Sequence, residues 1–97
     1  MTKDEARLED VRGWRRKAAR DLRAALHEAI REDDVLWSII TLHAQQAAEK
    51  SLKALLAWHD APFRKTHSLE ELGRQCAALD STLQELANEA APLTEYA

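Results

Sequence analysis

Cationic and hydrogen-bonding side chains recur at three- and four-residue steps near the middle of the chain. They are His43, Gln46, Lys50 and Lys53, and we call them the polar stripe. An α-helix turns by about 100° per residue, so these positions share a stripe about 80° wide. Lysine supplies a positive charge, histidine a titratable donor, and glutamine both a donor and an acceptor. The stripe therefore has the chemistry to hold a phosphate or a nucleotide, although no glycine-rich loop accompanies it.

A structural network would explain the same residues. Leu42 and Leu56 lie beside the stripe, which indicates a polar seam between packed helices or subunits, where polar groups need partners. Asp21 lies near the apolar border of its own predicted helix, where an unpaired carboxylate is costly. In this alternative Asp21 makes a structural ion pair with Lys50 or Lys53. Both interpretations remain open at this point.

A second cluster of candidate phosphate ligands lies in the predicted loop at 60–67. Its members are Arg64, Lys65, Thr66 and His67. They precede a predicted helix N-terminus, where backbone N–H groups and the helix dipole attract anions. If both clusters bind a ligand, His43 and His67 face one cleft. The alternative is a solvated basic loop in which His67 hydrogen-bonds to a neighbouring helix end.

The first predicted helix carries a row of arginines on an arc of about 80°. We call Arg12, Arg16, Arg20 and Arg23 the arginine row. Such a row can follow the phosphates of a nucleic acid backbone. Glu5, Glu9 and Glu28 lie along the same helix and can pair with arginines at three- and four-residue spacing. A solvated, internally paired charged face is the interpretation that the spacing favours.

These residues are positioned by helices. Apolar residues at helical spacing predict a first helix over 3–31 and a second helix that ends at Trp58 or His59. The acidic run at 32–34 is expected to break the pattern and to cap the second helix. The two helices should form a long antiparallel hairpin. On the second helix, small and apolar residues cluster on one side. They are Ile40, Ala44, Ala47, Ser51, Ala54 and Trp58.

The remaining residues predict shorter helices. Ser68 followed by Glu71 matches a capping box, so a third helix should begin there. Asp80 and Ser81 are expected to end it and to cap a fourth helix, and Pro92 to open a fifth segment. The buried positions expected on the third helix are Leu69, Leu72, Cys76 and Leu79. Trp14, Trp37 and Trp58 are interpreted as core or dimer anchors rather than as platforms for bases.

The composition indicates the fold class and the cellular compartment. The 97 residues suit one domain, and only two glycines and two prolines among many helix formers predict an all-α fold. A net charge of −3 argues against a generally basic nucleic-acid binder. A single cysteine, a charged N-terminal stretch and no long apolar run predict a soluble, cytoplasmic protein. No cysteine or histidine grouping has zinc spacing, and we expect neither a metal nor a cofactor.

Three blocks of the sequence resemble the HEPN domain family of prokaryotes. They are residues 19–25 (ARDLRAA), 43–56 (HAQQAAEKSLKALL) and 65–72 (KTHSLEEL). The resemblance covers residues 14–97 and implies an all-helical, up-and-down bundle of four helices plus the start of a fifth. It implies one domain over 1–97. In the family the C-terminal region continues towards an Arg-Tyr-Pro element that is absent here, so we expect a truncated or naturally shortened member.

The resemblance also implies partners and functions. HEPN domains are usually dimeric and are frequently paired with a small nucleotidyltransferase; some are ribonucleases and others bind nucleotides. Residues 43, 46, 50, 53, 64, 65 and 67 are thus predicted to bind a nucleotide or RNA phosphate for such a partner. The alternatives are a metal-independent endoribonuclease of a toxin–antitoxin pair and a purely structural dimerisation module.

The ribonuclease branch of the family carries an arginine and a histidine roughly four to six residues apart. In that motif the histidine serves as general base and the arginine stabilises the transition state. The nearest match here is Arg20 with His27, which lies in the first helix rather than towards the C-terminal half. Independent catalysis is therefore not the expected function.

Overall fold

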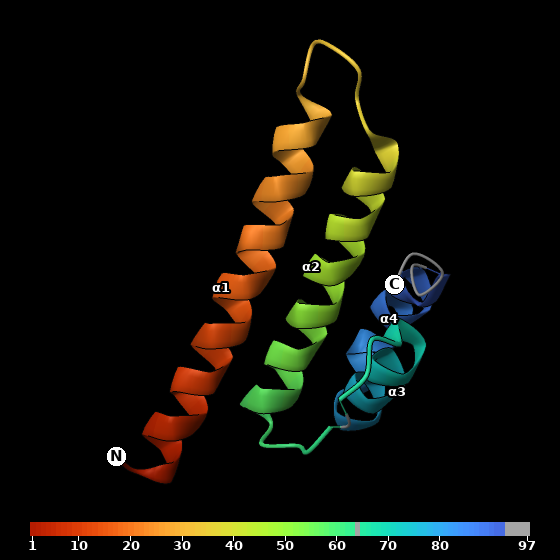
Figure 1. Cartoon of the computed structure of the whole chain (residues 1–97). Helices are drawn as coiled ribbons and strands as arrows, with labels where there is room; N and C mark the ends of the chain where they lie inside the picture. The colour runs from red at the N-terminus through yellow and green to blue at the C-terminus, as the bar shows by residue number, and fades with distance from the viewer. Residues whose placement is uncertain (64, 93–97) are drawn as a thin grey trace.

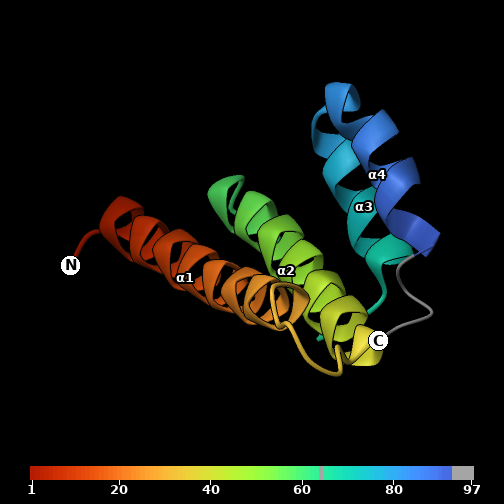
Figure 2. The same cartoon turned by 90° about the horizontal axis from the view of Figure 1, so that it is seen from above.

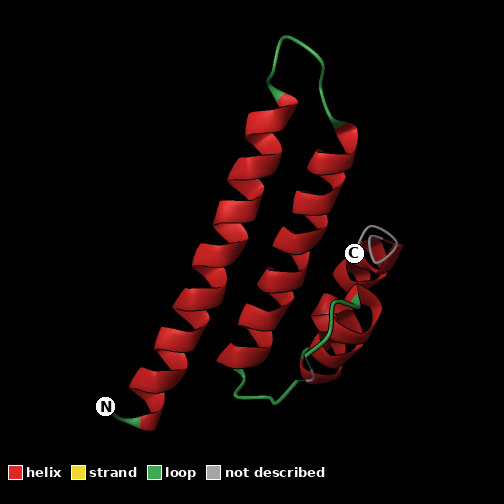
Figure 3. Cartoon of the chain, in the orientation of Figure 1, coloured by secondary structure: helices red, strands yellow, loops and turns green. Residues whose placement is uncertain are grey.

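A computed structural model describes residues 1–63 and 65–92 of the chain. This part contains α1 (Lys3–Ala29), α2 (Trp37–Trp58), α3 (Leu69–Leu79) and α4 (Gln84–Ala90), with a 3₁₀ turn over Ser81–Leu83 and no strand (Figure 3). The all-α prediction is confirmed. The predicted fifth segment after Pro92 lies outside the described residues. None of the described helices is long and apolar enough to span a membrane.

The helices are arranged as two antiparallel hairpins that pack together through α2. The long α1–α2 hairpin is the larger of the two, and the shorter α3–α4 hairpin packs on the side of α2 that faces away from α1 (Figures 1 and 2). As a result α2 is the central helix and has two packing faces, one towards α1 and one towards α3.

Local capping explains where the helices begin. The Thr2 hydroxyl accepts a hydrogen bond from the backbone N–H of Glu5 at the start of α1. The Ser68 hydroxyl accepts one from the N–H of Glu71 at 3.2 Å, so the predicted N-cap of α3 is confirmed. The Asp80 carboxylate accepts one from the N–H of Thr82 and begins the 3₁₀ turn that leads into α4.

The predicted acidic cap of α2 is wrong. The N-cap of α2 is Leu36, and no side chain of 32–34 bonds to the helix start. Instead the Glu28 carboxylate, at the end of α1, accepts a hydrogen bond from the Leu36 N–H at 2.8 Å. That bond is the main reason why the pKa of Glu28 lies below its usual range. The antiparallel hairpin brings the end of α1 against the start of α2, so a distant carboxylate takes the capping position.

The main core lies between α2 and α3. Its fully enclosed members are Leu52, Leu56, Leu69, Leu72 and Cys76. Burial raises the pKa of the Cys76 thiol, so the prediction of a packed cysteine is confirmed. The prediction that Leu79 is buried is wrong, because it is the last residue of α3 and the chain turns away at Asp80; its exposed fraction is 46%.

The tryptophans differ from one another. Trp14 is half-buried and its ring packs edge-on against Phe63, with ring centroids 6.0 Å apart. Trp37 and Trp58 are 70% and 55% exposed, so interpreting them as core residues is wrong. Arg7 of α1 lies over the Trp58 ring, with its guanidinium carbon 5.9 Å from the ring centroid.

Candidate functional site

Asp21, in the middle of α1, is bonded to two members of the polar stripe. One carboxylate oxygen lies 3.0 Å from His43 Nδ1, and the other accepts a hydrogen bond from Lys50 Nζ. Burial by itself raises the pKa of Asp21, but the hydrogen bonds and charges of Lys50 and His43 outweigh burial and keep that pKa below its usual value. Asp21 is therefore ionised at neutral pH and neutralises Lys50. Of the two pairings considered for Asp21, the structure has the one with Lys50.

Glu49 organises a second, deeper cluster on the neighbouring side of α2. Its side chain is only 4% exposed, and its oxygens lie 3.2 Å from Lys53 Nζ and 2.8 Å from His67 Nδ1. The Gln45 amide, also buried, donates to the backbone carbonyl of His67 at 3.4 Å. The loop that precedes α3 is thus tied to α2 by both the side chain and the backbone of His67.

Lys53 lies among aromatic rings. Its ammonium group is 5.2 Å from the centroid of the Trp14 ring and 6.0 Å from that of Phe63. These are distances at which a cation is attracted to the face of an aromatic ring. With a side chain that is 6% exposed, Lys53 is a buried cation that joins α1, α2 and the α2–α3 loop.

The predicted phosphate ligands are consequently divided between two carboxylates. His43 and Lys50 pair with Asp21, whereas Lys53 and His67 pair with Glu49. Of the remaining predicted ligands within the described residues, Gln46 and Lys65 hydrogen-bond to neither carboxylate. Gln46 is half-buried, Lys65 is exposed, and Arg64 lies outside the described residues.

Sequence reasoning missed Glu49 and Gln45. A signal for Glu49 was present, because a carboxylate four residues before Lys53 has the spacing of a helical ion pair. Its position among the leucines of the buried face of α2 also required a partner. The contribution of His67 could not be read from spacing, because it comes from a loop 18 residues away.

The arginine row is exposed along α1. Glu28, one of its expected partners, is instead occupied by Arg31 and the Leu36 backbone. Over the described residues, 1–63 and 65–92, none of the four arginines forms an ion pair. The expectation that glutamates neutralise this face is therefore wrong. Glu28 and Asp33 pair with Arg31, and Asp21 and Glu49 pair with residues of α2 and the α2–α3 loop, so within the described residues the row has no ion-pair partner.

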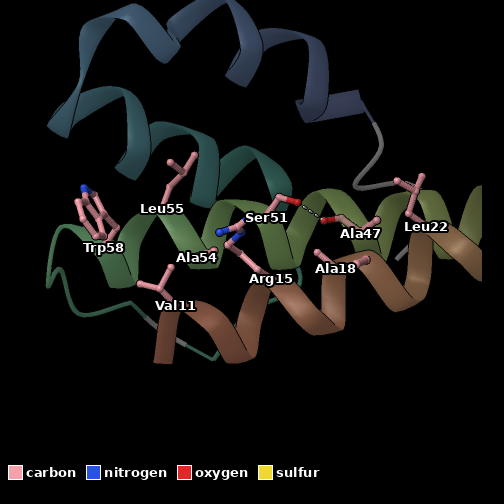
Figure 4. Close-up of a pocket in the computed structure, with 10 residues that line it drawn as sticks. Val11, Arg15, Ala18, Leu22, Ala47, Ser51, Ala54, Leu55 and Trp58 are labelled. Atoms are coloured by element: carbon pink, nitrogen blue, oxygen red, sulfur yellow. Dashed lines mark hydrogen bonds between the residues drawn. The ribbon is translucent and has the colours of Figure 1, made fainter. Parts of the chain in front are cut away.

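A shallow apolar groove of about 530 Å³ lies between α1 and α2 (Figure 4). Its lining on the α1 side is Val11, Arg15, Ala18, Ala19 and Leu22, and on the α2 side Ala47, Ser51, Ala54, Leu55 and Trp58. Alanines keep the two helices close and leave the groove shallow, while Leu22 and Trp58 project at its rim. Arg15 is the one charged residue in the lining.

The chain matches the HEPN domain family over residues 11–97. It belongs to the HEPN domain family. The match includes the arginine row, both carboxylate clusters and the groove, so all of them lie within the HEPN domain. No curated protein and no solved structure matches the chain. Membership confirms the resemblance and establishes a helical HEPN module, of a kind that is often related to nucleotides or RNA.

Proposed function

We propose that this HEPN module binds the phosphates of RNA or of a nucleotide. The observation that carries the proposal is the arginine row: four exposed guanidinium groups on one side of α1 that have no carboxylate partner in the described part of the chain. An uncompensated row of this kind attracts polyanions although the whole chain is acidic.

The length of the row favours a polynucleotide over a single nucleotide. Arg12 and Arg23 are eleven residues apart, which corresponds to about 16 Å along a helix. That distance exceeds the phosphate chain of one nucleoside triphosphate, whereas successive phosphates of a strand can reach all four side chains. RNA is therefore the favoured ligand within the proposal.

The polar stripe with Arg64, Lys65 and His67 is the second candidate surface for the same ligand. A phosphate there would compete with Asp21 for Lys50 and with Glu49 for Lys53. Because Lys53 is buried among aromatic rings, releasing it is costly. We expect this surface to contribute less than the arginine row.

The proposal includes the partners that the family resemblance implies. The module acts as a homodimer and presents its ligand to a nucleotidyltransferase. A metal-independent endoribonuclease stays the alternative, and RNA cleavage during the binding experiment would be its signature. Loss of that cleavage in His27→Ala would be needed to assign it to the pair of Arg20 and His27.

The test is binding of a fluorescently labelled single-stranded RNA, followed by anisotropy at several salt concentrations. Arg16→Gln together with Arg20→Gln should weaken binding at least about tenfold and reduce the dependence of log K on log salt by about 1.4, since each phosphate contact contributes about 0.7. A control with the same loss of charge is Lys3→Gln with Arg74→Gln, which removes exposed cations outside the row and should change affinity little.

Unchanged affinity in the arginine variant would contradict the proposal. A parallel calorimetric titration with ATP tests the mononucleotide form of the ligand. If Lys50→Gln weakens binding more than the arginine variant does, while circular dichroism shows an intact fold, the ligand lies on the polar stripe instead.

A further inference from the structure

A hollow of about 300 Å³ lies on α1 beside the arginine row, and arginine side chains surround it. Its lining consists of Arg12, Arg15, Arg16 and Ala19, and we call these four residues the arginine hollow. All four are exposed, and among the residues that the structure describes none of the three arginines forms an ion pair. The hollow is therefore a concave site with three positive charges and no carboxylate in its lining.

The spacing of the residues along α1 explains this hollow. Arg12, Arg15 and Arg16 are three and four residues apart, so they share one side of the helix within about 6 Å along its axis. Ala19 follows at the next turn on the same side, and its short side chain leaves space between the longer arginines. Arg15 also borders the groove between α1 and α2 (Figure 4).

The arginine hollow and the arginine row suit different anions. Arg16, Arg20 and Arg23 of the row are spread over about 10 Å, so each can meet a separate phosphodiester, which has a single negative charge. The hollow instead places three guanidinium groups around one point. A phosphate monoester carries a charge of about −1.5 to −2 at pH 7 and has three oxygens that accept hydrogen bonds. One monoester can therefore satisfy all three groups, whereas one diester cannot.

Carboxylates follow the hollow on its N-terminal side. Glu5 and Glu9 lie on the same side of α1 as the arginine row, both are exposed, and neither forms an ion pair in the described part of the chain. Their negative charges repel any phosphate placed beyond Arg12. A strand that follows the row from Arg23 is thus expected to end at the hollow.

We propose that the arginine hollow binds a terminal phosphate monoester of the RNA whose phosphodiesters lie along the row. This inference rests on the proposed function, because it places the end of the same ligand at one end of the row. Arg12 and Arg16 belong to both surfaces, so the strand continues from the hollow towards Arg20 and Arg23. The ligand class is then RNA with a phosphorylated end, 5′ or 3′.

The test compares three forms of one short RNA in the anisotropy assay, each with the same internal label. One form has a 5′-phosphate, one has a 3′-phosphate, and one has hydroxyl groups at both ends. A terminal phosphate at one of the two ends should tighten binding to the wild-type chain about fivefold, a modest gain because the hollow is open to solvent. Equal affinity for all three forms would overturn the proposal.

Arg15→Gln isolates the hollow, because Arg15 lines the hollow but lies outside the arginine row. This variant should lose most of the gain from the terminal phosphate. Arg23→Gln is the matched control, since it removes the same group from the row at a position outside the hollow. It should weaken the binding of all three RNA forms by the same factor and keep the gain. An equal loss of the gain in both variants would show general electrostatic attraction and contradict the assigned site.

Ala19→Leu fills the hollow without changing the charge. Leucine is a good helix former and Ala19 is exposed, so the fold should be retained, as circular dichroism can verify. The gain from the terminal phosphate should fall, while the affinity for unphosphorylated RNA should change little. Ala78→Leu makes the same change at an exposed position of α3 and should keep the gain. A full gain in Ala19→Leu would also overturn the proposal.

The proposed function and this inference fail separately. If Arg16→Gln with Arg20→Gln leaves the affinity for unphosphorylated RNA unchanged, phosphate binding by the row is wrong. If that variant weakens binding as expected, while neither terminal phosphate adds affinity in the wild type, the row stands and the assignment of the hollow is wrong.

Discussion

Two buried carboxylates pair with cationic side chains of this chain and so make them less available to a ligand. Asp21 pairs with Lys50 and His43, and Glu49 pairs with Lys53 and His67. Removing water from a carboxylate is costly, and each one is stabilised by two hydrogen-bonded donors. The most suggestive residues of the sequence therefore serve first to join the helices, and the exposed arginines of α1 are among the cations left for a ligand.

Asp21→Asn should lower the free energy of unfolding at pH 7 by about 1–3 kcal/mol, because Lys50 loses its charged partner. The pKa of Asp21 is lowered in the folded chain. Its stabilising contribution is hence complete above the ordinary aspartate pKa of about 4 and is lost as the pH falls through the lower folded value. The stability difference between variant and wild type should shrink below about pH 4, as measured by urea unfolding at several pH values.

Asp10→Asn is the control on the same helix, because Asp10 is exposed and forms no ion pair in the described part of the chain. It should change stability little at either pH. A difference for Asp21→Asn that stays constant down to pH 2 would contradict the assigned role of the ionised carboxylate.

At the scale of the elements, the α3–α4 hairpin depends on a close approach at one glycine. A Cβ atom added to Gly73 would lie 2.9 Å from the Cβ of Ala87 and 3.3 Å from its Cα. Both atoms belong to or sit directly on the backbone of α4, so neither can move aside without moving the helix. By contrast, a Cβ atom at Gly13, in α1, would meet nothing within 4 Å.

Gly73→Ala and Gly13→Ala should consequently have opposite effects. The first should destabilise the chain by about 1–3 kcal/mol, because α4 must shift away from α3. The second should stabilise it by about 0.5–1 kcal/mol, because alanine loses less backbone entropy in a helix interior. Urea unfolding followed by circular dichroism measures both. Equal effects of the same sign would show that the glycine at 73 is not a packing requirement.

At the scale of the whole molecule, α2 has too few neighbours to bury all of its apolar surface. It packs against α1 on one side and α3 on another, which leaves Trp37 and Trp58 of α2 70% and 55% exposed in a single chain. Ninety-seven residues can enclose only a modest core. Covering these side chains would therefore add substantially to the stability of the chain.

The midpoint of thermal unfolding should accordingly rise with protein concentration if unfolding is coupled to dissociation of the dimer. Leu22→Glu with Leu26→Glu puts charge on two leucines of α1 that are 51% and 55% exposed and so available to a partner copy. This variant should unfold at a lower temperature that does not depend on concentration. Differential scanning calorimetry at several concentrations measures both midpoints. A wild-type midpoint that is independent of concentration would indicate that the single chain is the stable unit.

The sequence by itself determined the features that depend on near neighbours along the chain. Helical periodicity predicted the all-α class, and the pair of Ser68 and Glu71 predicted the start of α3. The burial of Cys76 was predicted from its place on an apolar stripe of the same helix. Each of these depends on residues within one or two helical turns. Periodicity assigns every side chain an angle on its own helix, and such local signals are sufficient to find helix faces.

The tertiary structure decided which face met which neighbour. The cap of α2 comes from Glu28 rather than from the acidic residues beside it, and Glu49 is paired with His67 from a distant loop. Trp58, at the end of the apolar side of α2, is 55% exposed, while a face containing Gln45 and Glu49 is buried. The angular position of a side chain around its own helix does not specify how two helices are rotated relative to each other. These partners therefore depend on how the helices pack.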